Sequence, residues 1–369
     1  MRRIKMFEPQ IGSEEINAVV DVLKSRWLAH GPVVEAFERE FAEYIGVRYA
    51  AAVSNGTVAL VLALKALDVG PGDEVIVPNY TFIATATSVL MVGAKPVLVD
   101  VEPDTFNISV EEVQKAITSR TRAVIAVHLF GHPADVKALR EICDDRGIHL
   151  IEDAAQAHGA EAYGRKVGSW GHVSTFSFYA TKNLTTGEGG MVLSDDEQII
   201  RRVKMLRNHG QIAKYVHEML GGNFRMTSFQ AALGRAQLRK LDMLNDVRRR
   251  NAALLSSIVR EIHGVEPPVE KLWARHVYHL YAAKILLSDR DCVADCMKNA
   301  GIEVAVHYPV PINKQPLFVK LGYGSLVLPV SEKLSRVELS LPVHPGLSEE
   351  DIARVGNALK ECVEKCAQG

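Results

Sequence analysis

The stretch STFSFYATKNLTTGEGGMV, residues 174–192, places one lysine, Lys182, between a hydroxyl-rich aromatic run and a glycine-rich turn. A loop lysine is ordinarily a solvated surface residue, because its ammonium group is costly to bury. Gly187, Gly189 and Gly190 would let the backbone approach a ligand closely before the chain turns into the apolar run MVLS, although an ordinary turn uses glycines in the same way. The stretch indicates either a solvated turn or a lysine placed for chemistry, and its surroundings decide between them.

Short apolar runs alternate with helical patterns through the first two-thirds of the chain. The runs are typical of strands buried on both faces of a parallel sheet, and they cover 49–53, 74–78, 95–101, 123–131 and 148–153. Apolar spacing and capping residues predict helices between them at 57–67, 85–92, 109–118 and 134–146. Two earlier helices are predicted, one capped by Ser13 with apolar positions Ile16, Val19, Val20 and Leu23, and one with Val34, Phe37, Phe41 and Tyr44. This alternation predicts an α/β fold with a mainly parallel central sheet.

The character of the sequence changes after about residue 240. A long charged helical stretch, LRKLDMLNDVRRRNAALLSSIVREIHG, leads into the apolar run HVYHLYAAKILL and an alternating tail. We therefore predict a large α/β domain over residues 1–245 and a smaller C-terminal α+β domain over residues 246–369, with the boundary in or just after a helix. The length of 369 residues also favours two domains over one.

Charge and hydropathy limit the functional classes to which this protein can belong. The 43 Lys and Arg residues nearly balance the 44 Asp and Glu residues, so no net field favours nucleic acid or an anionic membrane surface. The basic clusters at 201–207 and 248–250 are expected to lie on solvated helix faces. No apolar run approaches the roughly 18 residues that a membrane span needs, and the N-terminus lacks the apolar stretch of a secretory leader. We expect a cytoplasmic protein that binds neither nucleic acid nor membranes.

The chain has five cysteines, which are Cys143, Cys292, Cys296, Cys362 and Cys366. The last four form two pairs at i, i+4 spacing, so free thiols packed on helices are the first expectation. A four-thiolate zinc site is the alternative if the two helices meet, but zinc ligands are usually spaced more closely. We therefore predict no metal site.

The residues that follow each strand are the candidates for a binding site, because ligands of open parallel sheets lie beyond the carboxyl ends of the strands. Residues 54–57 (Ser-Asn-Gly-Thr) open a helix and either cradle an anion with free backbone N–H groups or form only a turn and helix cap. Phe82 offers either an aromatic platform or a core side chain. Asp153 is either a functional carboxylate at a strand tip or the cap of the next helix, and Gln156 and His158 follow it.

Together with Lys182, these features fit one cofactor, pyridoxal 5′-phosphate (PLP). Lys182 would bond covalently to it, and Asp153 would keep the pyridine nitrogen protonated so that the ring can accept electrons. The cradle would fix the phosphate, and Ser177 could add a hydroxyl group to it. The combination predicts a PLP enzyme.

Five motifs also resemble signatures of the DegT/DnrJ/StrS-type nucleotide-sugar aminotransferases: VSNGTVAL, GDEVIVP, EDAAQAHGA, STFSFYATKNLTTGEGGMV and GGNFRMTSFQAALGRAQL. The resemblance runs from RWLAHGPVVEAFEREFAEYIG to LPVHPGLSEEDI, nearly the whole chain. It implies the type I fold of PLP-dependent aminotransferases, a homodimer, and transfer of an amino group from L-glutamate to a nucleotide-linked keto-sugar. The likeness is nearest to enzymes that aminate the 4-keto position of a GDP-linked 4-keto-6-deoxy sugar, and a UDP- or dTDP-linked 3-keto or 4-keto sugar is the alternative.

The resemblance implies a role for each matching residue. Lys182 is the implied catalytic residue and proton shuttle. The implied cofactor-binding residues are Gly56, Thr57, Phe82, Asp153, Gln156, Ser177, Lys182 and Asn223. Asn223 would reach the phosphate in the neighbouring subunit, so the sites of the homodimer would be shared, whereas capping the next helix is its alternative. The implied substrate contacts are Glu188, Arg225, His307 and Tyr308, and for Glu188 stabilisation of the turn is an equal alternative.

One departure, one related branch and one rival bear on these roles. The stretch HYPVPINKQP, residues 307–316, has Asn313 where the family often carries histidine, which puts sugar-nucleotide contacts there in question. A related branch that deoxygenates sugars replaces the lysine with histidine, so Lys182 disfavours that activity. A non-catalytic regulator that binds PLP or a sugar is the rival outside enzymes, and it would not need Lys182, Asp153 and Ser177 together.

Overall fold

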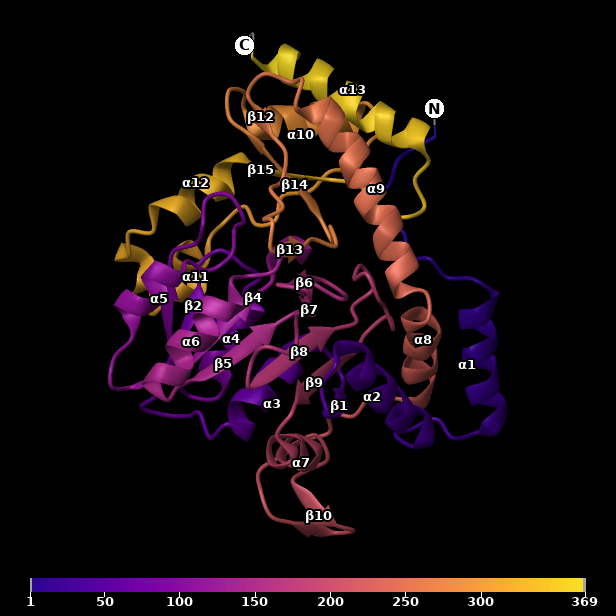
Figure 1. Ribbon diagram of the computed structural model, residues 1–369, viewed down its shortest axis with the longest axis vertical. Coiled ribbons are helices and arrows are strands. Elements are labelled where there is room, and N and C mark those ends of the chain that lie inside the picture. Colours follow the sequence, from indigo (N-terminus) through magenta and orange to yellow (C-terminus); the bar gives the residue numbers. More distant parts are fainter. Residues whose placement is uncertain (1, 368–369) are drawn as a thin grey trace.

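The computed structural model describes residues 2–367 and is built around a seven-stranded sheet (Figure 1). The strand order is β1-β9-β8-β5-β4-β2-β3. The strands are β1 (Tyr49–Val53), β2 (Glu74–Pro78), β3 (Lys95–Val99), β4 (Thr121–Val127), β5 (His149–Asp153), β8 (Val173–Ser177) and β9 (Gly190–Ser194). Only β9 runs against its neighbours in this sheet. The predicted α/β fold with a mainly parallel sheet is confirmed.

Alternate residues of each strand face opposite layers of helices, because successive side chains of a strand point to opposite faces. Ala52 and Val124 belong to the core beneath α2 (Pro32–Ile45), α5 (Val110–Ala116) and α6 (Val136–Arg146). Val53 and Ile125 belong to cores on the other side, beneath α3 (Gly56–Ala66), α4 (Ala84–Met91) and α7 (Glu197–Leu206). Burial on both faces explains why the strands read as continuous apolar runs.

Two predicted strands are shorter than expected. β3 ends at Val99, and β4 ends at Val127, after which Leu129–Gly131 form a 3₁₀ turn. The run 123–131 therefore joins a strand to a buried turn.

The first helix, α1 (Ser13–Ser25), has a different cap and a different buried face from those predicted. Gly12 is its N-cap, and its backbone N–H donates to Glu15 Oε2 at 2.8 Å. Glu15 is buried and also accepts hydrogen bonds from Gln237 and Lys240. These bonds orient α1 against α8 (Ser228–Leu238), so the predicted apolar positions Ile16 and Leu23 are exposed.

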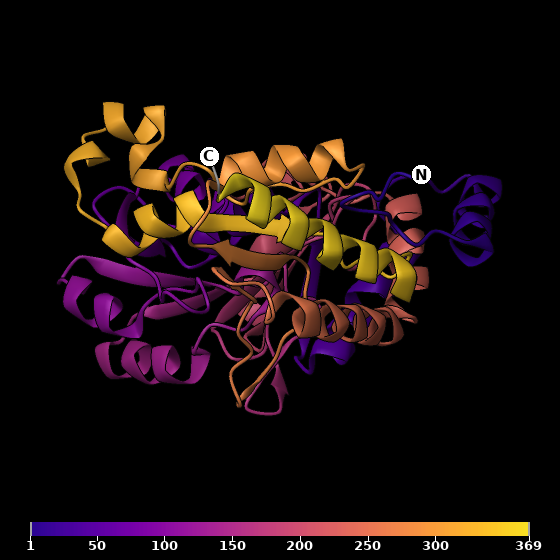
Figure 2. The ribbon, with the colours of Figure 1, turned by 90° about the horizontal axis from the view of Figure 1, so that it is seen from above.

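A second core forms where the C-terminal part of the chain folds. The helix α9 (Leu241–Val259) rises from α8 to a three-stranded sheet of β12 (Val265–Glu266), β14 (Tyr281–Ile285) and β15 (Glu338–Leu341) (Figure 1). Seen from above, α13 (Glu349–Cys366) lies between α9 and α10 (Arg290–Asn299) (Figure 2). Ile4, from the N-terminus, also packs in this core. We propose that the domain boundary lies within α9, near residue 245.

One C-terminal segment packs on the large sheet domain. Residues 312–328 include the short helices Ile312–Lys314, α11 (Pro316–Lys320) and Tyr323–Ser325, and they precede α12 (Pro329–Val337). Ile312 and Phe318 share a core with residues of β2 and α4. Polar contacts with the end of β2 also hold this segment in place, as described for the site below.

Two further small sheets complete the fold. One joins β6 (Glu161–Ala162), β7 (Arg165–Lys166) and β13 (Ala274–Arg275), and the other is the hairpin of β10 (Gln211–Ala213) and β11 (Val216–His217). This hairpin projects from the body of the molecule (Figure 1).

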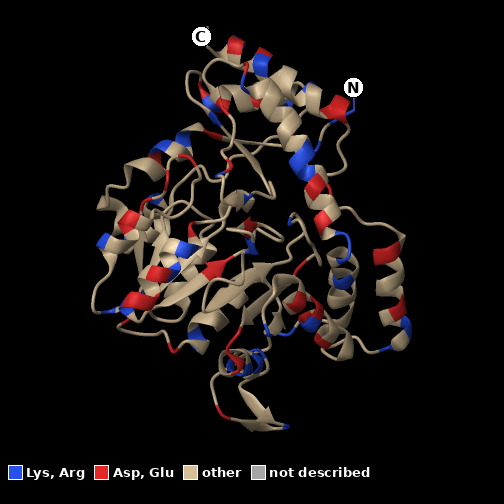
Figure 3. Cartoon of the chain, viewed as in Figure 1, with Lys and Arg blue, Asp and Glu red and all other residues tan. Residues whose placement is uncertain are grey.

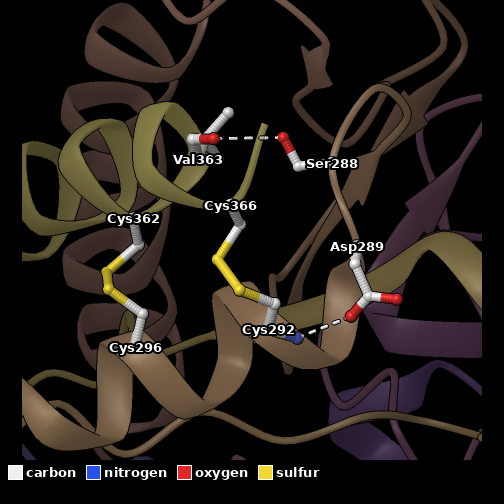
Figure 4. The surroundings of a disulfide bond; sticks show 7 residues. All are labelled: Ser288, Asp289, Cys292, Cys296, Cys362, Val363 and Cys366. Carbon is white, nitrogen blue, oxygen red and sulfur yellow. Dashed lines mark hydrogen bonds between the residues drawn. A yellow bond between two sulfur atoms is a disulfide. The ribbon is translucent and has the colours of Figure 1, made fainter. Parts of the chain in front are cut away.

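The four C-terminal cysteines form two disulfides between α10 and α13 (Figure 4). Cys292 bonds to Cys366, and Cys296 bonds to Cys362. The expectation of four free thiols is therefore wrong, because the two i, i+4 pairs face each other across the helices; the zinc alternative fails for the same reason. Cys143 is buried and free. Within residues 2–367, no group of three or more His, Cys, Asp or Glu side chains is arranged to hold a metal.

Lys, Arg, Asp and Glu are interspersed over the molecule (Figure 3). This distribution fits the near-zero net charge of the sequence. None of the helices in the described part of the chain combines the length and apolar character that crossing a membrane requires. A cytoplasmic location stays a prediction, and two disulfides are unusual in that compartment outside hyperthermophiles.

The disulfides are nested, which predicts non-additive effects on stability. In one variant both cysteines of the Cys292–Cys366 bridge are replaced by serine, and in another both cysteines of the Cys296–Cys362 bridge. The remaining bridge still closes nearly the same loop, so each of these variants is expected to lose about 2–3 kcal/mol of unfolding free energy. Removal of both bridges opens loops of 74 and 66 residues and is expected to cost roughly 7 kcal/mol. Urea unfolding without reductant measures the three values. Reductant should bring the wild type to the level of the four-serine variant, and an unchanged wild type would contradict the cross-links.

Candidate active site

The carboxyl ends of β1, β5 and β8 lie at one edge of the sheet, and the first of them forms a cradle. Asn55 caps α3 by accepting a hydrogen bond from Val58 N–H at 2.9 Å, which leaves the N–H groups of Gly56 and Thr57 at the start of the helix. A Cβ atom at Gly56 would stand 2.7 Å from Cβ of Ser177, so only glycine fits there. The fold thus brings Gly56, Thr57 and Ser177 together as a site suited to an anion.

Asp153 lies at the tip of β5 with 6% of its surface exposed. Its carboxylate accepts hydrogen bonds from Thr85 Oγ1 at 3.1 Å and from Ala155 N–H at 3.2 Å. Burial raises the pKa of Asp153, whereas these two hydrogen bonds and the charge of Lys182 oppose that rise. A desolvated carboxylate of this kind would gain from a nearby positive charge. Thr85 was not predicted, although a hydroxyl group on the helix after β2 could have suggested it.

Lys182 follows β8 in a turn and lies close to Asp153. Burial lowers the pKa of Lys182 to about 8, although the charge of Asp153 acts in the opposite direction. The amine is therefore easier to deprotonate near neutral pH than that of an ordinary lysine. Burial and the Lys182 charge both lower the pKa of His158, to about 3, and hold that of His279 well below its usual range. The charge of Lys182 is thus felt by two imidazoles that stay neutral and by one carboxylate.

The loop that carries Lys182 is fixed by its next residue, Asn183. This buried amide donates to Asn245 Oδ1 at 2.9 Å, and its oxygen lies 3.2 Å from His279 Nδ1. Asn245 in turn donates to the carbonyl of His158 at 2.8 Å. The polar contacts tie the Lys182 turn to α9, which sequence reasoning did not predict.

Aromatic groups from both domains line the same edge. Phe82 is 55% exposed, and its ring lies 6.0 Å from that of Tyr308. Gln156 Nε2 donates to Tyr308 Oη at 3.1 Å, and Gln156 Oε1 accepts from Phe130 N–H at 2.7 Å. An exposed aromatic ring at a strand end can stack on a planar ligand. Phe82, Gln156 and Tyr308 are therefore brought together.

His307 contacts the small sheet. Its ring Nδ1 lies 2.9 Å from Ser340 Oγ, and its backbone N–H donates to Glu338 Oε2 at 2.6 Å. Burial lowers the pKa of His307 to about 4, and the charge of Lys182 adds to this shift. Burial also raises the pKa of Glu338 to about 8. His307 therefore lies near the site as a neutral group.

Asn313, the residue that departs from the family motif, has a structural role. It is fully buried, its side chain accepts from Asn79 Nδ2 at 3.1 Å, and its backbone N–H donates to Asn79 Oδ1 at 2.9 Å. This pair holds the 307–316 stretch against the end of β2.

The remaining predicted residues lie at the rim. Asn223 is exposed, and the neighbouring carbonyl of Phe224 accepts from Ser54 N–H at 2.8 Å, so this segment runs beside the end of β1. The Arg225 guanidinium donates to Asn208 Oδ1. Glu188 is exposed, and its backbone carbonyl accepts from Gln230 Nε2 at 2.8 Å. Asn223 and Glu188 are therefore exposed to solvent near this edge, whereas Arg225 is held by Asn208.

The residues at this edge fit PLP. Lys182 supplies an amine with a lowered pKa, and Asp153 supplies a desolvated carboxylate for the ring nitrogen. Ser177 supplies a hydroxyl group and the start of α3 supplies N–H donors, and both suit the phosphate of the cofactor. Gly56 lies beside them, where any side chain would clash with Ser177. The chemistry of this donor set matches the three polar ends of the cofactor.

Comparison with known proteins assigns the family. The model of the DegT/DnrJ/EryC1/StrS aminotransferase family matches residues 9–360. The chain belongs to this family. Its members depend on PLP, and the chain is a PLP-dependent sugar aminotransferase. The family and cofactor predictions are confirmed, whereas the roles of individual residues stay predictions.

Relatives and solved structures cover nearly the whole aminotransferase. A dTDP-3-amino-3,4,6-trideoxy-alpha-D-glucose transaminase of Streptomyces venezuelae is 41% identical over 99% of this chain and 98% of its own. GDP-perosamine synthase of Vibrio cholerae is 37% identical over 97% of this chain and 98% of its own. The structure of S. venezuelae DesV with a ketimine intermediate superposes with a TM-score of 0.94 at 40% identity, covering 99% of both chains. The predicted type I aminotransferase fold is confirmed.

The electrostatic coupling between Asp153 and Lys182 predicts a pH effect on cofactor capture. Only the neutral amine can bond to PLP, so the capture rate of the apoprotein should rise with pH up to about 8. The negative charge of Asp153 stabilises the ammonium form of Lys182, so Asp153→Asn should lower the Lys182 pKa and move the curve to lower pH. Rapid-mixing absorbance from pH 5 to pH 10 measures the curve. Asp195→Asn is the matched control, because Asp195 lies on the surface beside Arg48, and this variant should not shift the pH curve. If the pH dependence of the capture rate in Asp153→Asn is unchanged, or shifts to higher pH, the electrostatic coupling between Asp153 and Lys182 would be contradicted.

Proposed function

We propose that this aminotransferase moves an amino group from L-glutamate to the keto group of a nucleotide-linked sugar. The main support is Lys182, whose pKa is lowered to about 8 beside Asp153 at the carboxyl edge of the sheet. Such an amine can act as a nucleophile and as a proton carrier at neutral pH. The curated relatives include enzymes named for dTDP-, GDP- and UDP-linked sugars, which supports this substrate class.

The chain's own residues would divide the work. PLP supplies, when bound, an electron sink for the charge that develops at the reacting carbon. Lys182 would bond to it, be displaced by the donor amine and then carry the proton between the two reacting carbons. Asp153 would hold the proton on the ring nitrogen, and Gly56, Thr57 and Ser177 would hold the phosphate. Phe82 would cover one face of the ring and exclude water, while Gln156 would lie near the ring oxygen.

For the acceptor we propose a GDP-linked 4-keto-6-deoxy sugar, the substrate class of a perosamine synthase. Synthases of GDP-perosamine from Vibrio cholerae and Caulobacter vibrioides are 37% and 39% identical to this chain. Relatives named for dTDP- and UDP-linked sugars are 41% identical, so these nucleotides are the competing acceptors.

A sensory or regulatory role is the second candidate. Two relatives carry regulatory names, the Erythromycin biosynthesis sensory transduction protein EryC1 at 43% identity and a Pleiotropic regulatory protein at 40%. A regulator has no need for a lysine with a lowered pKa beside a desolvated carboxylate, so the electrostatics of Lys182 and Asp153 favour the enzyme.

A substrate screen tests the proposed reaction. Purified enzyme with PLP and L-glutamate should aminate GDP-4-keto-6-deoxymannose in preference to dTDP- and UDP-linked 3-keto and 4-keto sugars, with mass spectrometry of the products as the measurement. Lys182→Ala and Lys182→Arg should retain the fold and lose at least about 10³-fold in turnover, because neither side chain can both bond to the cofactor and carry the proton. The surface variant Lys115→Ala is the matched control. Turnover by Lys182→Ala at the wild-type rate would refute the proposed chemistry.

We propose further that the enzyme is a homodimer with shared sites. Tyr215 in the β10–β11 hairpin and Leu220 after it are 81% and 84% exposed, and large exposed apolar side chains support a surface for another protein here. α1 and the residues after it add exposed apolar groups, including Ile16, Leu23 and Trp27. Asn223 follows the hairpin and is exposed, so it can reach a neighbouring chain rather than its own core.

Mixing two inactive variants tests the shared site. In a mixed dimer of Lys182→Ala and Asn223→Ala chains, one site would collect both defects and the other would be intact, so up to half of the wild-type activity per mixed dimer should return. Native mass spectrometry verifies that subunits have exchanged, and each variant alone is the control. Verified mixed dimers without recovery, when Asn223→Ala alone is inactive, would contradict sharing through Asn223.

A further inference from the structure

Three polar groups of the small domain form a chain that ends at His307. His307 Nδ1 lies 2.9 Å from Ser340 Oγ, and Ser340 Oγ lies 2.5 Å from Glu338 Oε1. The other carboxyl oxygen, Glu338 Oε2, accepts from the backbone N–H of His307 at 2.6 Å. Glu338 and Ser340 lie two residues apart on β15, and both are fully buried. The carboxyl group therefore communicates with the imidazole through a single hydroxyl group.

The carboxyl group of Glu338 makes no ion pair within residues 2–367. Arg290 donates to its backbone carbonyl and not to its carboxyl group, and Lys284, opposite it on β14, pairs with Glu266. Burial raises the pKa of Glu338 to about 8, although its hydrogen bonds and the charge of Arg290 oppose the rise. At neutral pH Glu338 therefore carries a proton that an ordinary glutamate would have lost.

The protonation of Glu338 decides which nitrogen of His307 carries a hydrogen. The imidazole is neutral, because burial lowers its pKa to about 4. When Glu338 is protonated, its Oε1–H donates to Ser340 Oγ, since Oε2 already accepts from the backbone. The Ser340 hydroxyl then donates to Nδ1, and the imidazole hydrogen lies on Nε2. When Glu338 is ionised, Ser340 donates to the carboxylate, Nδ1–H donates to Ser340, and Nε2 becomes an acceptor.

The Nε2 atom of His307 is available to a ligand. It makes no hydrogen bond within residues 2–367, and it is not among the buried atoms that lack a partner, so it is not sealed from the surroundings. The charge of Lys182 adds to the lowering of the His307 pKa. Burial raises the pKa of Tyr308, and the charges of Asp153 and Glu338 both add to that rise. The chain of groups therefore ends in the same region as Lys182 and Asp153.

We infer that Glu338, acting through Ser340, fixes the hydrogen of His307 on Nε2, and that Nε2–H donates to an oxygen of the bound substrate. This inference rests on the proposed function and deepens it. Keto and carboxylate oxygens accept hydrogen bonds and cannot donate them, so an Nε2 lone pair would repel the substrate that Nε2–H binds. Glu338 and Ser340 are positioning residues, since they act only through His307.

Nuclear magnetic resonance reads the tautomer directly. Imidazole nitrogens with and without a hydrogen differ in nitrogen-15 chemical shift, so the PLP-loaded protein labelled at histidine reports both atoms, and His307→Gln assigns the signals. His307 should carry its hydrogen on Nε2 at pH 6. The hydrogen should move to Nδ1 as the pH rises through about 8, because Glu338 loses its proton there. Lys182 titrates in the same range, so Lys182→Ala protein should show the same change.

Variants of the relay separate its members. In Glu338→Gln the amide oxygen can accept from the His307 N–H, which leaves the amide N–H to donate to Ser340, so the hydrogen should stay on Nε2 from pH 6 to pH 10. Ser340→Ala removes the link and should abolish the change near pH 8. Glu266→Gln, exposed in the same small sheet, is the matched control and should titrate like the wild type.

The two half-reactions show which substrate uses the donor. Both are followed by the absorbance of the cofactor, one with L-glutamate and one with the nucleotide-linked keto-sugar. At pH 9, one unit above the pKa of Glu338, only about a tenth of the wild type keeps the proton, so Glu338→Gln should be roughly tenfold faster in that half-reaction. At pH 6 the two proteins should react equally. A merely structural role would slow Glu338→Gln at every pH.

The outcomes separate the inference from the proposed function. A wild-type tautomer that is constant from pH 6 to pH 10, or a hydrogen already on Nδ1 at pH 6, would overturn the inference and leave the transaminase assignment intact, and this test stands even if Glu338→Gln does not fold. A tautomer change that alters neither half-reaction would also overturn it. A protein with the expected tautomer change that aminates no sugar would instead refute the proposed function.

Discussion

The site depends on two opposite charges that the fold removes from water together. Asp153 ends β5 and Lys182 follows β8, and burial pushes each toward its neutral form while the other charge opposes that shift. A carboxylate and an amine in solution would be fully charged at neutral pH. At this edge the amine can lose its proton, and the carboxylate remains in need of a cation. The sheet creates this balance because its strands end at a common edge and their ends are screened by both domains.

The small domain meets this edge through hydrogen bonds. Tyr80 Oη donates to the carbonyl of His307 at 2.9 Å and accepts from the N–H of Tyr308 at 2.8 Å, so one phenol holds two consecutive residues of the other domain. The Asn79–Asn313 pair and the Gln156–Tyr308 bond add contacts along the same seam. Directional bonds of this kind fix where Tyr308 lies relative to Phe82 more narrowly than apolar packing would. Polar contacts from residues 79–80, directly after β2, and from Gln156 therefore fix where the 307–313 stretch lies against this edge.

Residues near a strand or helix end could be predicted from sequence, and residues joined by tertiary contact could not. Lys182, Asp153 and Gly56 follow apolar runs whose ends must meet in a parallel sheet. Thr85 was missed because its bond to Asp153 depends on how α4 packs on β5. The disulfides were missed because i, i+4 spacing says nothing about which helices face each other. Arg248 is buried, although its run of three arginines predicted a solvated helix face, because it shares the helical stripe of Leu244, Ala252 and Leu255.

Two groups that stability does not explain lie together at the carboxyl ends of the strands. A folded chain usually pairs its buried charges and covers its large aromatic side chains, and Arg207 with Glu38 and Phe37 in the core follow that rule. Asp153 and the exposed ring of Phe82 break it, and both lie at the strand ends beside the Lys182 turn. Each exception would be removed by a ligand of matching chemistry, which is a cationic ring nitrogen for Asp153 and a planar ring for Phe82. A chain selected for stability alone would have no reason to keep these two exceptions together, so their coincidence is the physical signature of the site.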